Sequence, residues 1–130
     1  MITEDYISFK TARLLKEKGF DEDCWSWYED EDYAVESNDD YGYQSNTDHI
    51  SKYFICSRPT LQMAMKWLRE KHRLEIYPFH EAFQECNNWW YRIEKHTKGC
   101  NMSKFESDSI YLSYEQACEA AIKYCLENLI

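Results

Sequence analysis

Carboxylates are the side chains in this sequence that could most readily bind a metal, transfer a proton or attract a cation, and they are concentrated in one stretch. Between Gly19 and Ser51 there are eleven Asp or Glu residues and no Lys or Arg. This window carries a formal charge of −11, the remaining residues carry +2, and the whole chain of 130 residues carries −9. The acidity is therefore regional, and a surface that concentrates it would attract a basic partner.

Metal binding is the first chemistry that such a stretch suggests. An EF-hand loop needs oxygen ligands at its positions 1, 3 and 5, with glycine at position 6. If Gly42 is aligned with that glycine, the three ligand positions fall on Ser37, Asp39 and Tyr41, and neither Ser37 nor Tyr41 suits the role. The six cysteines and four histidines form no C-x-x-C pair and show no ligand spacing. We assign no metal and no cofactor, and we expect the cysteines to be free, buried thiols.

Catalysis needs more than abundant carboxylates. General acid–base work requires a carboxyl group whose pKa is shifted by burial against a defined partner. The sequence contains no Gly-x-Ser-x-Gly motif, no Walker loop and no Cys/His pair at the spacing of a known nucleophile. We therefore name no catalytic residue, and the sequence does not favour an enzyme.

Aromatic residues alternate with the acids in the same stretch, and this combination is typical of a protein-binding surface. Tyr and Trp are enriched at interfaces. We therefore expect a non-catalytic protein–protein interaction domain, either an adaptor or a DNA-mimic-like protein, whose unknown partner is basic; a homodimer stays open. The alternative is structural, with rings facing the core and acids protecting strand edges. The candidate partner-binding residues lie within 21–48 and are Trp25, Trp27, Glu29, Asp30, Glu31, Asp32, Tyr33, Asp39, Asp40, Tyr41 and Tyr43.

The first of three predicted helices covers residues 8–18, with Thr3 and Ser8 both suited to the N-cap. Gly19 fits the left-handed C′ position, and Phe20 would fold back on Leu15 as in a Schellman motif.

The second predicted helix covers residues 57–72, with Pro59 in its first turn, and it has a wide apolar face. The third covers residues 113–129, where Ser113 and Gln116 match a capping box.

Short alternating segments between these helices predict two sets of strands, at 24–30, 32–36 and 52–57, and at 74–79, 88–96 and 108–113. The fold class is therefore α+β: three helices and two small antiparallel β-meanders in the order α-βββ-α-βββ-α. We expect a single domain over residues 1–130, with the middle helix packed between the two strand sets. A weak sequence similarity between "MAMKWLRE" and "AAIKYCLE" suggests an internal pseudo-duplication.

Three segments resemble a family of small uncharacterised proteins from gut Bacteroidetes that is often associated with prophages or mobile elements. They read "FKTARLLKEKGFDEDC", "PTLQMAMKWLREKH" followed by "IYP", and "YEQACEAAIKYCLENLI". The resemblance implies a bacterial cytosolic protein of mobile-element origin, and it carries no activity or site residues. A cytoplasmic location also agrees with an N-terminus that lacks a secretory signal, and with the lack of any apolar run near the roughly 20 residues of a membrane span.

Two other functions can be weighed from the order of elements. Residues 59–129 follow the helix–three strands–helix order of a double-stranded RNA-binding domain, which needs a basic face. The last predicted helix has three acids and one lysine, so we do not expect nucleic-acid binding there. The alternative to an interaction domain is a small enzyme or ligand-binding domain with a pocket between a sheet and the middle helix.

Overall fold

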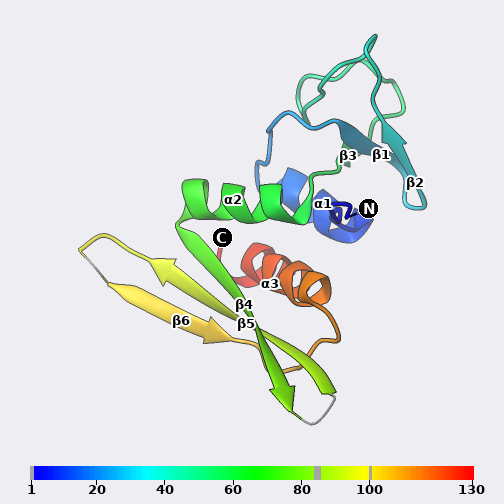
Figure 1. The fold of residues 1–130 in the computed structure, drawn as a ribbon. Helices are drawn as coiled ribbons and strands as arrows, with labels where there is room; N and C mark the ends of the chain where they lie inside the picture. Colours follow the sequence, from blue (N-terminus) through cyan, green and yellow to red (C-terminus); the bar gives the residue numbers. More distant parts are fainter. Residues whose placement is uncertain (1, 84–85, 100) are drawn as a thin grey trace. The chain divides into compact units, whose positions relative to one another are not determined.

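A computed structural model describes residues 2–83, 86–99 and 101–130, and its elements follow the predicted α+β order (Figure 1). The chain forms two compact units, Met1–Thr60 and Leu61–Ile130, which are treated separately below. The elements of the first unit are α1 (Phe9–Glu17), β1 (Ser26–Asp30), β2 (Tyr33–Glu36) and β3 (Cys56–Ser57). Those of the second unit are α2 (Leu61–His72), β4 (Leu74–Phe83), β5 (Cys86–His96), β6 (Met102–Glu106) and α3 (Tyr114–Asn128).

The helix ends follow the local sequence signals. Ser8 is the N-cap of α1, and Gly19 follows the helix with φ of 95°. The N–H of Phe20 donates to the carbonyl of Leu15 at 2.9 Å, so the predicted Schellman motif is confirmed. At α3 the Ser113 hydroxyl accepts from the N–H of Gln116 at 3.1 Å, which confirms that cap.

The predicted start of the middle helix is wrong. The helix begins at Leu61, because the residues before it are held in extended pairing. The N–H of Arg58 donates to the carbonyl of Ser26 at 2.9 Å, and the carbonyl of Pro59 accepts from the N–H of Ile7 at 3.0 Å. Pro59 therefore lies outside the helix, in an extended segment that pairs with Tyr6 and Ile7 near the N-terminus.

The first sheet has the strand order β2-β1-β3, with all pairs antiparallel. β1 is central, and β3 is only two residues long rather than the predicted 52–57. The ring of Tyr28 lies 5.4 Å from Phe9 of α1, and its hydroxyl donates to the carbonyl of Ile7 at 2.5 Å. The Phe9–Tyr28 ring contact thus joins α1 to the sheet, and the Tyr28 hydrogen bond holds the residue just before the helix cap.

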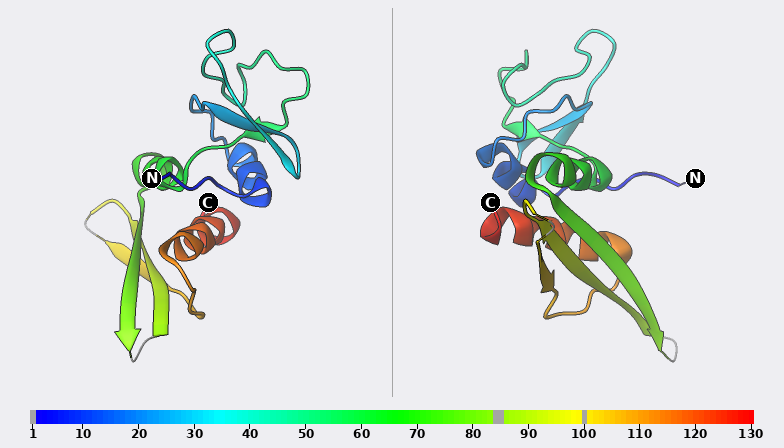
Figure 2. Two further views of the ribbon diagram at one scale, coloured as in Figure 1. Left: turned by 45° about the vertical axis from the view of Figure 1, so that its right-hand side comes forward. Right: turned by 90° about the vertical axis from the view of Figure 1, so that its left-hand side faces the viewer.

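The second sheet is a true meander, β4-β5-β6. α3 covers the face that carries Leu74, Ile76, Tyr91 and Ile93, all at most 7% exposed, and α2 packs against β4 and α3 (Figure 2). Small residues on α3 are fully buried and let the elements approach closely; they are Ala117, Cys118, Ala121 and Cys125. The predicted position of α2 between the two strand sets stays a prediction.

The third strand of this sheet is not the predicted segment 108–113. β6 occupies residues 102–106 instead, since a turn closes between Thr97 and Asn101, whose backbone groups pair at 2.9 Å. The predicted segment contributes a single bridge, in which Tyr111 and Trp89 exchange hydrogen bonds of 2.8 and 2.9 Å. The two sheets also differ in strand order, so the weak sequence similarity between the two halves is not accompanied by a repeated topology.

Pro78 lies within the edge strand β4 without breaking its ladder. The N–H of His96 donates to the carbonyl of Arg73 at 3.0 Å, and the register pairs Pro78 with Tyr91. Hydrogen-bonded pairs alternate along an antiparallel ladder, so the nitrogen of Pro78 faces away from β5. No ladder bond is lost, and the missing N–H discourages pairing with a further strand.

No helix among the described residues combines the length and the apolar composition needed to cross a bilayer.

Candidate functional site

The acidic stretch forms β1, β2 and a long loop that returns to β3, and buried amide side chains hold this loop in place. Asn46 is 8% exposed; its Nδ2 donates to the carbonyl of Phe20 at 2.6 Å, and its Oδ1 accepts from the N–H of Ser57 at 2.9 Å. One side chain therefore ties the loop both to the end of α1 and to β3.

Gln44, two residues before Asn46, performs a similar role. Its Nε2 donates to the carbonyls of Tyr41 and Tyr43 at 2.7 and 3.2 Å, and its Oε1 accepts from the N–H of Ile50 at 2.7 Å. Its backbone exchanges hydrogen bonds of 2.7 and 2.9 Å with Cys24. These contacts give an otherwise irregular loop a defined conformation, because each satisfies a backbone group that has no ladder partner.

The exposed acids and rings fall into two groups, one in the β1–β2 turn and one in the loop that follows β2, two segments that Figure 1 shows apart from each other. The tip group is the β1–β2 turn with Asp30, Glu31, Asp32 and Tyr33, all exposed. The loop group is Asp39, Asp40, Tyr41 and Tyr43, also exposed, with Trp25. The turn and the loop leave opposite ends of β1, which spans about 13 Å at ~3.3 Å per residue. The structure therefore does not gather the predicted residues into one continuous patch.

Aromatic contacts organise the loop group. Trp25 is 37% exposed and lies 5.0 Å from Tyr43, which is 65% exposed. Tyr41, 47% exposed, rests edge-on against Trp27 at 6.3 Å. Rings that are held by neighbouring rings keep one orientation, so these side chains present fixed surfaces to solvent.

Of the predicted residues, Trp27 is buried and Glu29 is half-buried. Trp27 is only 2% exposed, and its Nε1 donates to Glu29 Oε2 at 2.9 Å. The same oxygen accepts from the Ser51 hydroxyl at 2.8 Å. Both tryptophans fall in the predicted strand 24–30, but Trp25 precedes β1 and lies against Tyr43. Trp27 and Glu29 support the surface from beneath, and we leave them out of it.

None of the exposed carboxylates of the two groups has a lysine, arginine or histidine within 4.0 Å in the described part of the chain. The loop acids take part in local turns instead: Asn38 Oδ1 accepts from the N–H groups of Asp40 and Tyr41 at 2.9 and 3.0 Å. The negative charge is therefore available to a partner.

Sequence reasoning missed Gln44 and Asn46, the residues that hold this surface. Both stand in the polar run "YQSNTD", where nothing in spacing or type distinguishes them from solvated loop residues. Only their burial and their bonds to backbone atoms distant in sequence reveal the role.

The buried thiols are poor nucleophiles. Cys24, Cys56, Cys118 and Cys125 are free and buried, as predicted. Burial raises the pKa of Cys24 and Cys125 to about 12, and that of Cys56 and Cys118 to about 11. Thiols protonated at neutral pH do not attack substrates readily. The side chain of Cys86 and all of Cys100 lie outside the described part.

Within the described ranges, no three His, Cys, Asp or Glu side chains gather as metal ligands would. A comparison with known protein families, curated proteins and solved structures finds no match for this chain. The resemblance to a Bacteroidetes family and the cytoplasmic location stay predictions.

Proposed function

We propose that this protein is a non-catalytic protein–protein interaction domain, whose first unit binds a basic protein surface through the tip group and the loop group. One observation supports this above all. Four rings, Trp25, Tyr33, Tyr41 and Tyr43, are 37–65% exposed beside carboxylates that have no cationic partner in the described chain.

Arginine is the residue type that this arrangement suits best. A guanidinium group can stack on an aromatic face while its N–H groups pair with a carboxylate, and Trp and Tyr are good stacking partners. The loop is already ordered by Gln44 and Asn46, so binding would cost little conformational entropy there.

The two groups separate the adaptor role from the DNA-mimic-like role. A DNA mimic presents negative charge over a wide span, so both groups would contact one partner. An adaptor can use either group alone. Neutralising one group at a time therefore distinguishes the two roles.

Affinity capture tests the proposal. The full chain is immobilised and incubated with bacterial lysate at low and at moderate salt, and bound proteins are identified by mass spectrometry. Two variants replace the carboxylates of either the tip group or the loop group with the corresponding amides. The control carries Glu4→Gln, Asp5→Asn and Glu17→Gln, three exposed acids of the same unit.

We expect a basic protein that is retained at low salt, is lost as screening increases, and is unaffected in the control. Loss in both variants supports the DNA-mimic-like role, and loss in one supports the adaptor role. Capture that persists in a combined variant of both groups would contradict the proposal.

A further inference from the structure

The sheet of the second unit has a face that the helices do not cover. Trp89 lies 5.5 Å from Tyr114 of α3, and Tyr91 lies 6.4 Å from Tyr124, so both point toward the helix. Side chains alternate along a strand, and Trp90 and Arg92 therefore point the other way. The register places Tyr77 opposite Arg92 and Phe79 opposite Trp90. This outer face is defined here by Tyr77, Phe79, Trp90, Arg92 and Lys104.

Flat π-systems occupy adjacent positions on the outer face. Phe79 is 44% exposed and Tyr77 is 38% exposed, although both lie in the middle of a regular strand. The guanidinium carbon of Arg92 lies 5.2 Å from the centre of the Tyr77 ring. Three rings and a planar cation on neighbouring strands form a platform on which other flat groups could stack.

Cationic groups border these rings. The Glu94 side chain, 11% exposed, is paired with Arg92 Nε at 3.3 Å and with His96 Nε2 at 3.5 Å. Lys104 stands directly opposite Glu94 in the β5–β6 register, and its ammonium has no carboxylate within 4.0 Å in the described chain. The charge of Glu94 is thus already balanced by Arg92, which leaves Lys104 as an available cation.

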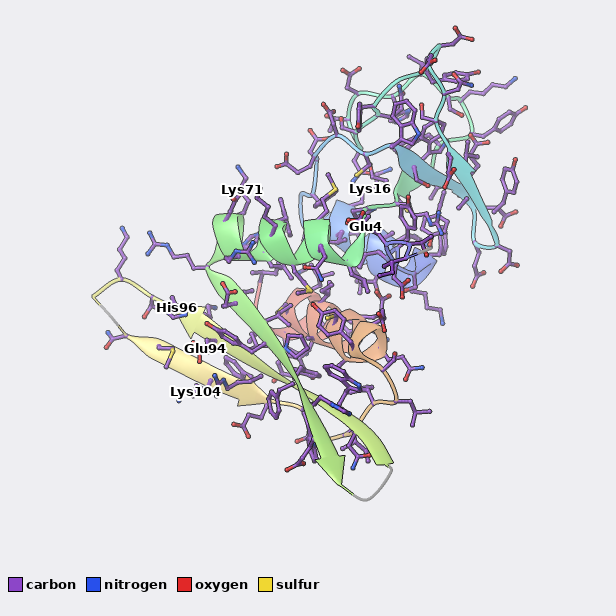
Figure 3. All side chains as sticks on the ribbon, viewed as in Figure 1. Glu4, Lys16, Lys71, Glu94, His96 and Lys104 are labelled. Carbon is purple, nitrogen blue, oxygen red and sulfur yellow. The ribbon has the colours of Figure 1, made fainter. Side chains whose placement is uncertain are left out.

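The same end of the sheet carries further positive charge. Lys71 and Arg73 are exposed where α2 passes into β4, and the backbone of Arg73 pairs with that of His96. Lys98 is exposed in the turn between β5 and β6. In the view of Figure 3, Lys71, His96 and Lys104 all lie toward the left of the second unit, with Glu94 between His96 and Lys104. The second unit as a whole has 9 bases against 10 acids, compared with 6 against 14 in the first.

We propose that the outer face binds single-stranded nucleic acid. Bases would stack on Phe79 and Trp90, while Lys104 would contact a phosphate and Arg92 would stay paired with Glu94. Such binding combines an aromatic platform with nearby cations, and it requires unpaired bases whose faces are accessible. The acidic helix α3 lies on the opposite face and takes no part. The same register also places four acids on this face, namely Glu75, Glu81, Glu94 and Glu106. We therefore expect binding that is weak and strongly dependent on salt.

Fluorescence anisotropy of labelled oligothymidylate and oligouridylate, titrated with the full protein, provides the test. At low salt we expect saturable binding that weakens as salt increases, with a slope of about −0.7 for each phosphate contact. A DNA duplex of equal length and an oligoglutamate peptide serve as competitors. Weaker competition by both is expected, because neither offers accessible base faces.

Variants on the platform give the sharper result. Phe79→Ala should raise Kd about tenfold, since base stacking on one ring accounts for that much. Lys104→Gln should raise Kd about threefold and reduce the salt slope by about 0.7. The controls are Tyr53→Ala, a ring of similar exposure in the first unit, and Lys123→Gln on α3; both should leave Kd unchanged.

Phe79 and Lys104 are exposed, so neither substitution should prevent folding. The proposal is overturned if no oligonucleotide binds at low salt, or if Phe79→Ala binds as tightly as the wild type. It is also overturned if the duplex or the oligoglutamate competes as well as single strands do, since charge or a protein partner would then explain the binding.

Discussion

The two units of this protein are specified by different interactions. In the second unit, strands of 10 and 11 residues alternate between a helix-covered face and a solvent face, and apolar packing holds them. In the first unit, strands of 5, 4 and 2 residues leave most of the backbone outside regular ladders. Amide side chains satisfy that backbone instead. A chain with 14 acids against 6 bases in one unit can therefore still fold to a defined loop structure.

The largest effect should come from the apolar core of the second unit. Ile93→Ala removes a side chain that is 0% exposed at the centre of β5. We expect a loss of about 3–4 kcal/mol in the free energy of unfolding, from lost burial and the resulting cavity. Urea denaturation measures this loss. Ile110→Ala, at a 50% exposed position, should cost under about 0.5 kcal/mol. Equal costs at the two positions would contradict the description of this core.

Asn46→Ala tests the polar support of the first unit. It removes the two buried hydrogen bonds from the Asn46 side chain to the carbonyl of Phe20 and the N–H of Ser57, which should cost about 2–3 kcal/mol. Hydrogen exchange should show loss of protection at the Ser57 amide. Asn38→Ala, which removes exposed turn contacts, is the matched control and should cost less than about 1 kcal/mol. If the two variants lose the same stability, buried amides do not organise this unit.

Ser113→Ala addresses a local signal in the second unit. Loss of the hydrogen bond from Gln116 N–H to the Ser113 hydroxyl should cost about 1 kcal/mol. Ser113→Asp should restore most of it, because a carboxylate both accepts that bond and interacts well with the helix N-terminus. Thermal denaturation of the three proteins makes the comparison. An Asp variant no more stable than the Ala variant would show that the cap contributes nothing.

The smallest effect concerns pH. The hydroxyl of Thr47 and its N–H donate to Asp21 at 2.6 and 2.9 Å, and these bonds lower the pKa of this carboxyl below 3.8. Its folded-state pKa is thus below the unfolded value. The stabilisation is present above about pH 4 and is lost as pH falls through the folded-state pKa.

Asp21→Asn should therefore destabilise the protein slightly near neutral pH and make no difference in strong acid. Urea denaturation at several pH values measures the trend, with Asp23→Asn as the exposed control. A difference between wild type and Asp21→Asn that does not change with pH would rule out this linkage.

Local signals in the sequence predicted those parts of the fold that local chemistry determines. Gly19 ended a helix and Ser113 began one, since each acts within a few residues. The third strand of the second sheet could not be found this way. Residues 108–113 alternate as a strand does, yet 102–106 pair with β5 because the short turn before them brings them alongside it. Pro59 was placed in a helix because the local pattern does not reveal its hydrogen-bond partner, Ile7, which is distant in sequence.

The candidate surface followed a similar division. Charge and ring content identified its acids and tyrosines, because Asp and Glu side chains are mostly exposed in folded proteins. Composition could not show that Trp25 is exposed and Trp27 buried, or that Asn46 supports the loop. It also could not place Phe79 and Lys104 on one face, since that depends on strand register.

The buried thiols have a practical consequence. Among the cysteines whose side chains the structure describes, each unit holds two, Cys24 and Cys56 in the first and Cys118 and Cys125 in the second, with pKa values of about 11–12. An alkylating reagent at neutral pH meets almost no thiolate until a unit opens and the pKa returns to its ordinary value. The rate at which the corresponding peptides gain the mass of the reagent therefore reports how often the thiols become accessible. It records the opening of each unit separately, without any engineered label.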